Sequence, residues 1–348
     1  MTAPIVAFFN NKGGVGKTSL VYHLSWMYAD LGLRVLAADL DPQANLSGAC
    51  LDDDALEALW SEQDVGSIHG FLQPLLKGSG DVREPRLQEI TSTLFSTIGL
   101  LPGDLALSRF EDELSKQWPE CLDRSERAFR VSSAFWRILR MAARGMEADI
   151  VLMDLGPDLG AINRAALLAA DWIVVPLAPD LFSLQGLRNL GPTMRRWRDE
   201  WRDRLQRNPE PTLALPEGLL KPAGYVVLQQ PVRLDRPVQA YERWTARIPQ
   251  EYGESVLDSP SGGMSLAPSV DANCLMSIRH YRSLISMAQE ARKPVFHLQA
   301  ADGAIGSHAG AVTQARRDFE SLARRIASVV LPGALDACGD VHPERIKA

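Results

Sequence analysis

The chain reads Phe8-Phe9-Asn10-Asn11-Lys12-Gly13-Gly14-Val15-Gly16-Lys17-Thr18-Ser19 close to its first residue. A short apolar run from Ile5 precedes this stretch, and apolar residues at helical spacing follow it. A strand, a glycine-rich turn and a helix are the context that a phosphate-binding loop needs, because glycines let backbone N–H groups curl around phosphate oxygens. The helix N-terminus adds positive charge at the same place. We therefore predict that residues 11–19 bind nucleotide phosphates, with Lys17 at the β- and γ-phosphates and the Thr18 hydroxyl on Mg²⁺.

The loop carries a second lysine. The ordinary pattern G-x-x-x-x-G-K-[ST] has glycine where this chain has Asn11, and Lys12 stands directly before a Gly-Gly pair. The string resembles the deviant Walker A motif, K-G-G-x-G-K-[ST], of the ParA/MinD family of ATPases. That resemblance implies ATP as the nucleotide, and it implies that Lys12 reaches across a nucleotide-sandwich dimer to the partner's phosphates. The sequence contains no N-K-x-D guanine-reading motif downstream, which is consistent with adenine.

Two apolar runs downstream end in carboxylates. Residues 35–38 lead to Asp39 and Asp41 within the string D-L-D-P-Q, and residues 150–153 lead to Asp154 in a Walker B pattern. Ligands of open α/β sheets collect at the carboxyl ends of the strands, so these acids can meet the loop. The family resemblance implies that Asp41 positions the attacking water, and that Thr18, Asp39 and Asp154 hold or support Mg²⁺. Gly156-Pro157 replaces the family's usual Pro-Pro after Asp154, and we expect this change to alter hydrolysis rather than nucleotide binding.

Composition limits the class of protein. The chain has 348 residues, of which 46% are hydrophobic and 23% charged, as in ordinary globular proteins. The sequence has no run of about 18 apolar residues, so we expect no membrane span. The first strand begins so early that we also expect no signal peptide. Four scattered cysteines and six histidines lack metal-ligand spacing, which favours reduced thiols in the cytoplasm. The net charge of −6 argues against general electrostatic binding to DNA, but it leaves room for a local basic face and for nucleoid association.

The alternation of apolar strands and helical segments predicts an α/β fold. We expect a doubly wound, mostly parallel sheet flanked by helices on both faces, the architecture of a P-loop NTPase. Residues 1–330 are expected to form a single ATPase domain with insertions near 208–222 and 250–272, and residues 331–348 a C-terminal tail. Further strands are expected at 97–101, 172–176, 225–228 and 294–298, and further helices at 127–144, 234–252, 277–291 and 312–330. Gln230 follows the strand at 225–228, where the family often has an asparagine that contacts adenine, so the resemblance implies a base contact there.

Arginines gather in two predicted helices. Residues 188–207 hold seven arginines against three acidic residues, and Arg195, Arg198 and Arg202 fall on one outer face at helical spacing. Arg316 and Arg317 belong to a second cluster near the C-terminal end. Such faces either contact the phosphates of DNA or are only solvated, and the sequence leaves both interpretations open.

Three functions compete for this ATPase. The first is a ParA-type partition or cargo-positioning ATPase, an ATP-dependent homodimer that binds double-stranded DNA nonspecifically and is stimulated by a ParB-like or cargo-adaptor protein. Lys12, Lys17 and Asp41 would then be the catalytic residues. The second is a MinD-like ATPase of the membrane surface, although residues 331–348 make a poor amphipathic helix because they contain two prolines and two glycines. The third is a metabolic or electron-transfer relative, such as a nitrogenase iron-protein-like reductase or an amidoligase. We rank them in that order.

Overall fold

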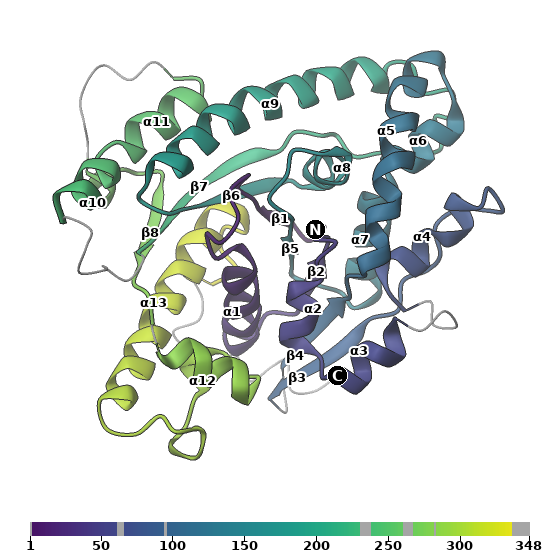
Figure 1. Cartoon of the computed structure of the whole chain (residues 1–348). Coiled ribbons are helices and arrows are strands. Elements are labelled where there is room, and N and C mark those ends of the chain that lie inside the picture. The colour runs from purple at the N-terminus through teal and green to yellow at the C-terminus, as the bar shows by residue number, and fades with distance from the viewer. Residues whose placement is uncertain are drawn as a thin grey trace.

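A single β-sheet organises the computed structural model, which describes residues 2–60, 66–93, 96–229, 238–259, 267–281 and 283–335. Its strands lie in the order β3-β4-β2-β5-β1-β6-β7-β8 (Figure 1). Neighbouring strands are parallel except β3, which is antiparallel to β4. The bounds are β1 Ile5–Phe8, β2 Val35–Asp39, β3 Gln88–Thr93, β4 Ser96–Leu101, β5 Ile150–Asp154, β6 Trp172–Leu177, β7 Lys221–Leu228 and β8 Cys274–Ile278. The predicted doubly wound, mostly parallel sheet is confirmed.

Helices cover both faces of this sheet. Alternate residues of β1 point to opposite cores: Ile5 and Ala7 belong to one buried cluster, and Val6 and Phe8 to the other. The first cluster receives apolar side chains from α4 Ile68–Leu76, α5 Phe110–Glu120, α7 Ala134–Gly145, α8 Ala161–Ala169, α9 Leu181–Leu205 and α11 Ile248–Ser255. The second receives them from α1 Lys17–Asp30, α2 Asn45–Cys50, α12 Ser283–Ala291 and α13 Ser307–Val330. Both faces of the strands are therefore buried, which explains their almost uninterrupted apolar runs.

A small third cluster joins the ends of three helices away from the loop. Trp118 of α5 stacks on Trp201 of α9 at 5.8 Å between ring centroids, and Phe129 of α6 Glu126–Ser132 packs beside them. Cys121 is buried in the same cluster. Three apolar residues at helical spacing on α9, Met194, Trp197 and Trp201, are all buried.

The end of the sheet differs from the sequence prediction. Residues 294–298 are not a strand, because Val295–His297 form a 3₁₀ turn that begins after Pro294 and buries its apolar side chains against α13. Proline fixes its own φ and has no N–H to give to a ladder. The last described strand is β8, which pairs in parallel with β7 and lies where the sequence predicts a loop and a helix start. Short apolar runs of similar length and composition cannot be assigned by periodicity alone.

Several helices are shorter than their patterns indicate. Residues 127–144 form α6 and α7, separated at Ser133, whose hydroxyl donates to the carbonyl oxygen of Phe129. The described part of 234–252 contains α10 Val238–Thr245 and α11, and residues 277–291 yield only α12 after β8. The acidic segment after residue 52 forms α3 Asp53–Leu59, with Asp52 as its N-cap. None of the described helices is both long and apolar enough to cross a bilayer.

Candidate nucleotide-binding site

The glycine-rich loop joins β1 to α1 at the carboxyl edge of the sheet. Gly14 and Gly16 have φ angles of 72° and 75°, in the left-handed region that favours glycine. A Cβ on Gly16 would also lie 2.8 Å from the side chain of Leu228 at the end of β7. Two of the loop's glycines are thus required by backbone conformation, and one of them by close packing as well.

Lys17 spans the inside of this loop. Its Nζ donates to the carbonyl oxygens of Asn10, at 3.1 Å, and Lys12, at 3.3 Å. Burial lowers the pKa of Lys17, while Asp154, Asp41 and Asp158 oppose that shift. The Lys17 ammonium therefore lies among carboxylates and carbonyl oxygens. Phosphate oxygens can take the place of these acceptors, because they too are hydrogen-bond acceptors that attract a positive charge.

Lys12 has a different environment. Its ammonium forms an ion pair with the carboxylate of Asp180, 168 residues further along the chain. The other oxygen of Asp180 accepts the N–H of Ser183 at 2.9 Å and so caps the N-terminus of α9. The structure therefore separates the two lysines of the loop: Lys17 is turned inward, and Lys12 is bound to α9 of the same chain.

Helix α9 also packs directly on the loop. The Asn10 amide donates to the carbonyl oxygen of Pro176 at 2.7 Å, just before α9 begins. A Cβ on Gly186 of α9 would lie 2.6 Å from Oδ1 of Asn11 and 3.0 Å from Oδ1 of Asn10. Only a glycine lets the helix approach the loop this closely, so α9 and the loop form one packed unit.

Three aspartates predicted for the site lie close together, and two of them, Asp41 and Asp154, lie near Lys17. Asp39 and Asp154 are fully buried, and β2 and β5 place them opposite one another in register. Asp39 accepts the N–H and the hydroxyl of Ser47 at 2.8 and 2.7 Å through one oxygen. Asp41 accepts the N–H of Gln43 at 2.9 Å. Burial raises the pKa of Asp39 to about 7, with Asp41 adding to the shift, and burial beside Asp39 raises the pKa of Asp154 well above its usual range.

The unpartnered oxygens of these acids show whether the residues present could hold Mg²⁺. Within the described part of the chain, both oxygens of Asp154 and Oδ1 of Asp39 are buried without a hydrogen-bond partner. The same part of the chain holds no group of three His, Cys, Asp or Glu side chains that could bind a metal ion alone. Mg²⁺ commonly takes one or two carboxylates together with substrate phosphates, so a site built from Asp154, the Thr18 hydroxyl and a nucleotide fits the residues present.

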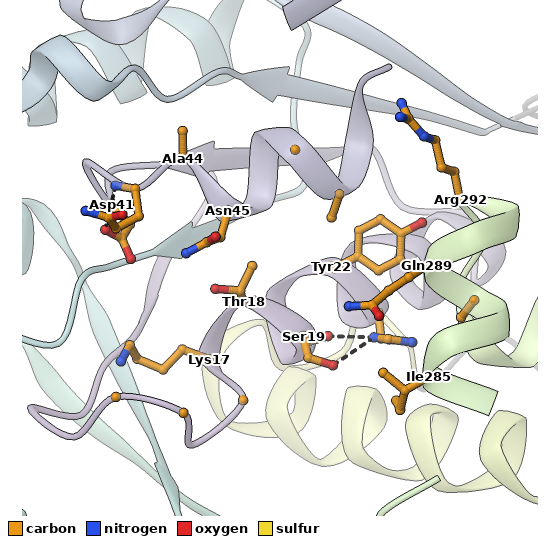
Figure 2. Close-up of a pocket in the computed structure, with 18 of the residues that line it drawn as sticks. Lys17, Thr18, Ser19, Tyr22, Asp41, Ala44, Asn45, Ile285, Gln289 and Arg292 are labelled. Carbon is orange, nitrogen blue, oxygen red and sulfur yellow. Dashed lines mark hydrogen bonds between the residues drawn. The ribbon is translucent and has the colours of Figure 1, made fainter. Parts of the chain in front are cut away.

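A cavity of about 940 Å³ extends from the loop across α1. Figure 2 shows Lys17, Thr18 and Asp41 at one end, and Tyr22, Gln289 and Arg292 at the other. His23 lines this cavity with its Nδ1 2.6 Å from the carbonyl oxygen of Ser19, and burial lowers its pKa to about 4. The volume is large enough for a nucleotide.

A second cavity of about 220 Å³ adjoins the other side of the loop. It is lined by Leu228 and Gln229 at the end of β7 and by residues 278–281 at the end of β8. Gln230, the residue with the implied adenine contact, lies outside the described residues. Its neighbour Gln229 is described, and its N–H donates to the carbonyl oxygen of Ile278 at 2.8 Å.

The five arginines suggested for DNA contacts lie on opposite faces of the sheet. On α9, Arg195 donates to the carbonyl oxygen of Ser255 at 2.8 Å, Arg198 donates to that of Leu219, and Arg202 pairs with Asp199 while remaining largely exposed. On α13, Arg316 pairs with the buried Asp30 at 3.1 Å, and Arg317 is exposed. The two clusters therefore do not form one continuous basic surface, and three of the five guanidinium groups hold neighbouring segments in place.

Sequence reasoning missed four residues of the site. Asp180, Gly186, Asp158 and His23 all contact the loop or face its lysines, yet only His23 had a local signal, its i+4 spacing from Ser19. The others reach the loop from elements more than 140 residues away. A pattern read along the chain contains no information on such contacts.

Comparison with known proteins identifies the family to which this chain belongs. A family model described as an AAA domain matches residues 3–207, which is more than half of the chain. Soj of Bacillus subtilis, a sporulation initiation inhibitor protein, is 30% identical over 191 residues, covering 55% of this chain and 64% of Soj. The chromosome partitioning protein ParA of Caulobacter vibrioides is 30% identical over 202 residues, covering 58% of this chain and 66% of ParA.

The chain belongs to the ParA/MinD family of ATPases. Another relative, IncC of Escherichia coli, is 31% identical over 186 residues, which cover 53% of this chain and 44% of IncC. The chain thus spans between 44 and 66% of the length of these three relatives.

Solved structures of similar proteins share the fold. Protein DIP2308 of Corynebacterium diphtheriae superposes with a TM-score of 0.68 at 24% identity, covering 94% of this chain and 99% of that protein. An ATP complex of McdA from Cyanothece superposes with a TM-score of 0.61 at 14% identity, covering 94% of this ParA/MinD-family chain and 97% of McdA. Both likenesses extend over nearly the whole chain, so the shared fold continues beyond residue 207.

Proposed function

We propose that the chain is an Mg²⁺-dependent ATP hydrolase that acts in the cytoplasm as a single domain over residues 1–330. One observation carries the proposal: Asp41 and Asp154 lie close enough to Lys17 to act on its charge, Asp39 lies beside Asp154, and three buried oxygens of Asp39 and Asp154 have no partner among the described residues. Such oxygens are costly to bury unless a cation completes the site. The membership in an ATPase family and the ATP bound to McdA support the same assignment.

Each residue has a role in this chemistry. The amides of residues 13–18 and the Lys17 ammonium bind and neutralise the phosphates, and Thr18 and Asp154, supported by Asp39, hold the metal. If Mg²⁺ is bound there, it would supply further positive charge to the phosphates. Asp41 lies at the rim of the same cavity, where its carboxylate orients the attacking water. Catalysis is then mainly positioning and charge neutralisation rather than covalent chemistry.

Dimerisation makes the hydrolase a switch. Lys12 is bound to Asp180 in the single chain and reaches the phosphates of a partner subunit when two ATP-loaded copies meet. Leu181 and Phe182, the first residues of α9, are 50% and 73% exposed beside this ion pair. An exposed apolar pair next to the loop supports a homodimer interface there. Hydrolysis removes the γ-phosphate that Lys12 binds, so the dimer separates.

The switch serves DNA partition or cargo positioning. The chromosome partitioning protein ParA among the relatives supports this role, and the exposed Arg202 and Arg317 remain available for phosphates of double-stranded DNA. A ParB-like or cargo-adaptor protein would stimulate hydrolysis, and binding to DNA would associate the ATP form with the nucleoid. Cys121 is buried among tryptophans away from the loop, so no observation favours a cluster-binding reductase.

Binding to random-sequence double-stranded DNA tests this role. We would measure it with ATP, ADP and no nucleotide at two salt concentrations, beside an Arg202→Ala variant and an Arg196→Ala control from the same helix. We expect salt-sensitive binding with ATP only, weakened in Arg202→Ala. A protein that dimerises with ATP but binds no DNA contradicts the partition role and leaves the ATPase intact.

A further inference from the structure

The loop between Asp154 and α8 is held by residues outside the predicted site. It comprises residues 155–160, and α8 begins at Ala161. A Cβ on Gly156 would lie 3.3 Å from Oδ1 of Asp41 and 3.4 Å from Oδ2 of Asp158. The loop therefore borders the carboxylate that we assign to the attacking water.

Asn163 fixes this loop from the first turn of α8. Its side chain is 1% exposed, and its Nδ2 donates to the carbonyl oxygens of Gly156, at 3.2 Å, and Asp158, at 2.8 Å. One amide group thus holds two points of the loop. The loop can keep its place beside Asp41 only while the start of α8 keeps its own.

Glu111 of α5 fixes the start of α8. Its two carboxylate oxygens accept the N–H groups of Ala161, at 2.5 Å, and Ile162, at 2.7 Å. Gly160 precedes the helix and has no side chain that could cap it. A carboxylate that accepts two backbone N–H groups at a helix N-terminus forms charge-assisted hydrogen bonds and also interacts well with the helix dipole. Glu111 therefore replaces the local cap that α8 lacks.

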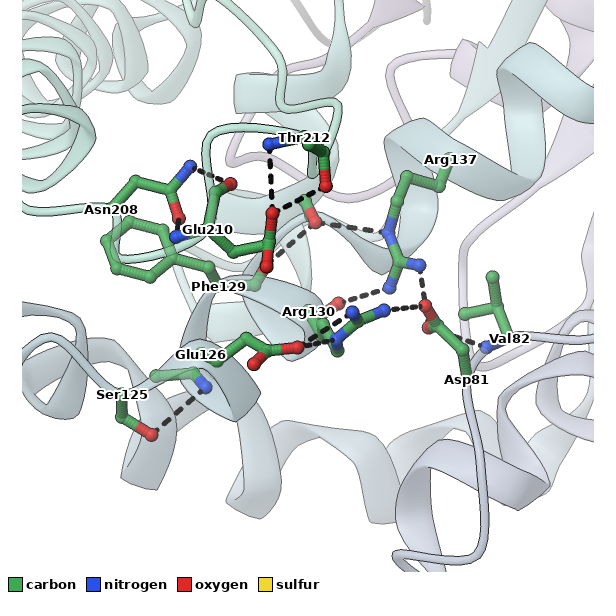
Figure 3. Close-up of polar contacts among 12 residues, drawn as sticks. Asp81, Val82, Ser125, Glu126, Phe129, Arg130, Arg137, Asn208, Glu210 and Thr212 are labelled. Atoms are coloured by element: carbon green, nitrogen blue, oxygen red, sulfur yellow. Dashed lines mark hydrogen bonds and ion pairs between the residues drawn. The ribbon is translucent and has the colours of Figure 1, made fainter.

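Helix α5, which carries Glu111, is held in place by contacts with α6, α8 and α9. Two turns further along α5, the Trp118 ring contacts the guanidinium groups of Arg164 on α8, at 4.3 Å, and Arg204 on α9, at 4.0 Å. The outer side of α5 contacts α6 through Glu113 and Arg127. Figure 3 shows how α6 and α7 are anchored in turn, with Arg130 and Arg137 both bonded to the carboxylate of Asp81.

We propose that Glu111 is a positioning residue for ATP hydrolysis: it fixes α8 and, through Asn163, the loop that borders Asp41. Glu111 is not among the described residues that line the cavity of about 940 Å³. The inference rests on the proposed function, because it assigns Glu111 to the same hydrolytic site. A residue with this role affects kcat, whereas a helix cap without it affects only the stability of the fold.

Two substitutions test this role in different ways. Glu111→Gln keeps the size of the side chain and removes its charge and one acceptor. Gly160→Ala leaves Glu111 in place, but its Cβ would lie 2.7 Å from Oε1 of Glu111 and from Oδ1 of Asp158, so the contact must shift. The backbone at Gly160, with φ −79° and ψ −173°, accepts alanine. Glu113→Gln is the matched control, since it makes the same change in the same turn of α5 but faces α6.

The experiment measures steady-state ATPase kinetics, the affinity for a fluorescent ATP analogue and thermal unfolding for the wild-type chain and the three variants. We expect Glu111→Gln and Gly160→Ala to lower kcat on the order of tenfold or more, because misplacement by a fraction of an ångström is costly. Their KM and analogue affinity should stay within about twofold of wild type, the signature of a contact that acts only in the chemical step. Glu113→Gln should hydrolyse ATP as the wild type does.

Other results overturn the proposal. If both variants turn over ATP normally, even while unfolding at lower temperature, Glu111 is only a helix cap. If they lose nucleotide affinity while keeping kcat, or if Glu113→Gln is as slow as Glu111→Gln, the specific link to Asp41 is refuted. A wild-type chain that binds the analogue but shows no ATPase activity refutes the proposed function itself. The role of Glu111 is then refuted as well, because it depends on that function.

Discussion

The ion pair between Lys12 and Asp180 makes a quantitative prediction for dimerisation. Its two side chains are 23% and 21% exposed, so the pair is worth about 0.5–1 kcal/mol, toward the upper end for pairs near a surface. Each protomer breaks one such pair when Lys12 moves to the partner's phosphates. The cost is therefore about 1–2 kcal/mol per dimer, which corresponds to roughly five- to thirtyfold in the dissociation constant.

Asp180→Asn removes this cost with little other disturbance. Asparagine caps helices about as well as aspartate, so its side-chain oxygen can still accept the Ser183 N–H, and α9 should keep its start. We expect the variant to dimerise five- to thirtyfold more tightly than wild type, by the same energies. The assay is sedimentation equilibrium with Mg²⁺ and a non-hydrolysable ATP analogue, over a range of protein concentrations.

The control for this experiment is Asp199→Asn. Asp199 lies on the same helix, pairs with Arg202 at 3.1 Å and is 70% exposed, so its substitution changes the net charge equally without touching the loop. The reasoning is refuted if Asp180→Asn dimerises no more tightly than wild type, or if Asp199→Asn has the same effect. Weaker dimerisation of Asp180→Asn would mean that Asp180 serves the dimer rather than opposing it.

Three further substitutions test the packing around the loop. His23, with its pKa lowered to about 4 by burial, stays neutral in the folded chain but takes up a proton near pH 6.5 when unfolded. Its contribution to stability is therefore present above pH 6.5 and lost as pH falls toward 4. The unfolding free energy of wild type relative to His23→Leu should thus fall by about 2 kcal/mol between pH 7 and pH 5 in urea titrations, and a flat difference would contradict this. Gly186→Ala should weaken ATP binding on the order of tenfold in calorimetric titrations without lowering stability, because its Cβ would meet Asn11 while alanine favours the helix. Gly191→Ala should instead destabilise the fold by about 1–3 kcal/mol in the same urea titrations, because its Cβ would lie 1.7 Å from the carbonyl oxygen of Ser255 on α11.

The parts of the molecule that local sequence determines were predictable. Buried parallel strands read as continuous apolar runs, so β1, β2, β5 and β6 could be recognised with their ends close to the observed residues. The glycine-rich loop is equally local, since Gly14 and Gly16 are needed for backbone conformation. Where a run was short, as at 274–278 and 294–298, periodicity could not distinguish strand from turn.

Contacts between distant elements were not predictable. Lys12 meets Asp180 across 168 residues, and Glu111 meets the α8 amides across 50 or 51. Neither acid has a sequence signal beyond its place in the first turn or cap of a helix, where acidic residues are common for local reasons. The family resemblance implied a role for Lys12 toward a partner subunit. It did not indicate that the same lysine is held by its own chain.

A mixing experiment tests whether ATP-driven dimerisation and hydrolysis are one process because Lys12 acts in the partner's site. Lys12→Ala and Asp41→Ala should each bind ATP and each be inactive alone. In a mixed dimer, the Lys12→Ala subunit keeps its own Asp41 and receives Lys12 from the other subunit, so one of its two sites is complete. Random pairing in a symmetric dimer then restores about one quarter of the wild-type ATPase rate on equal mixing. If the mixture hydrolyses no more ATP than the separate variants, Lys12 does not act in trans and the switch as described is wrong.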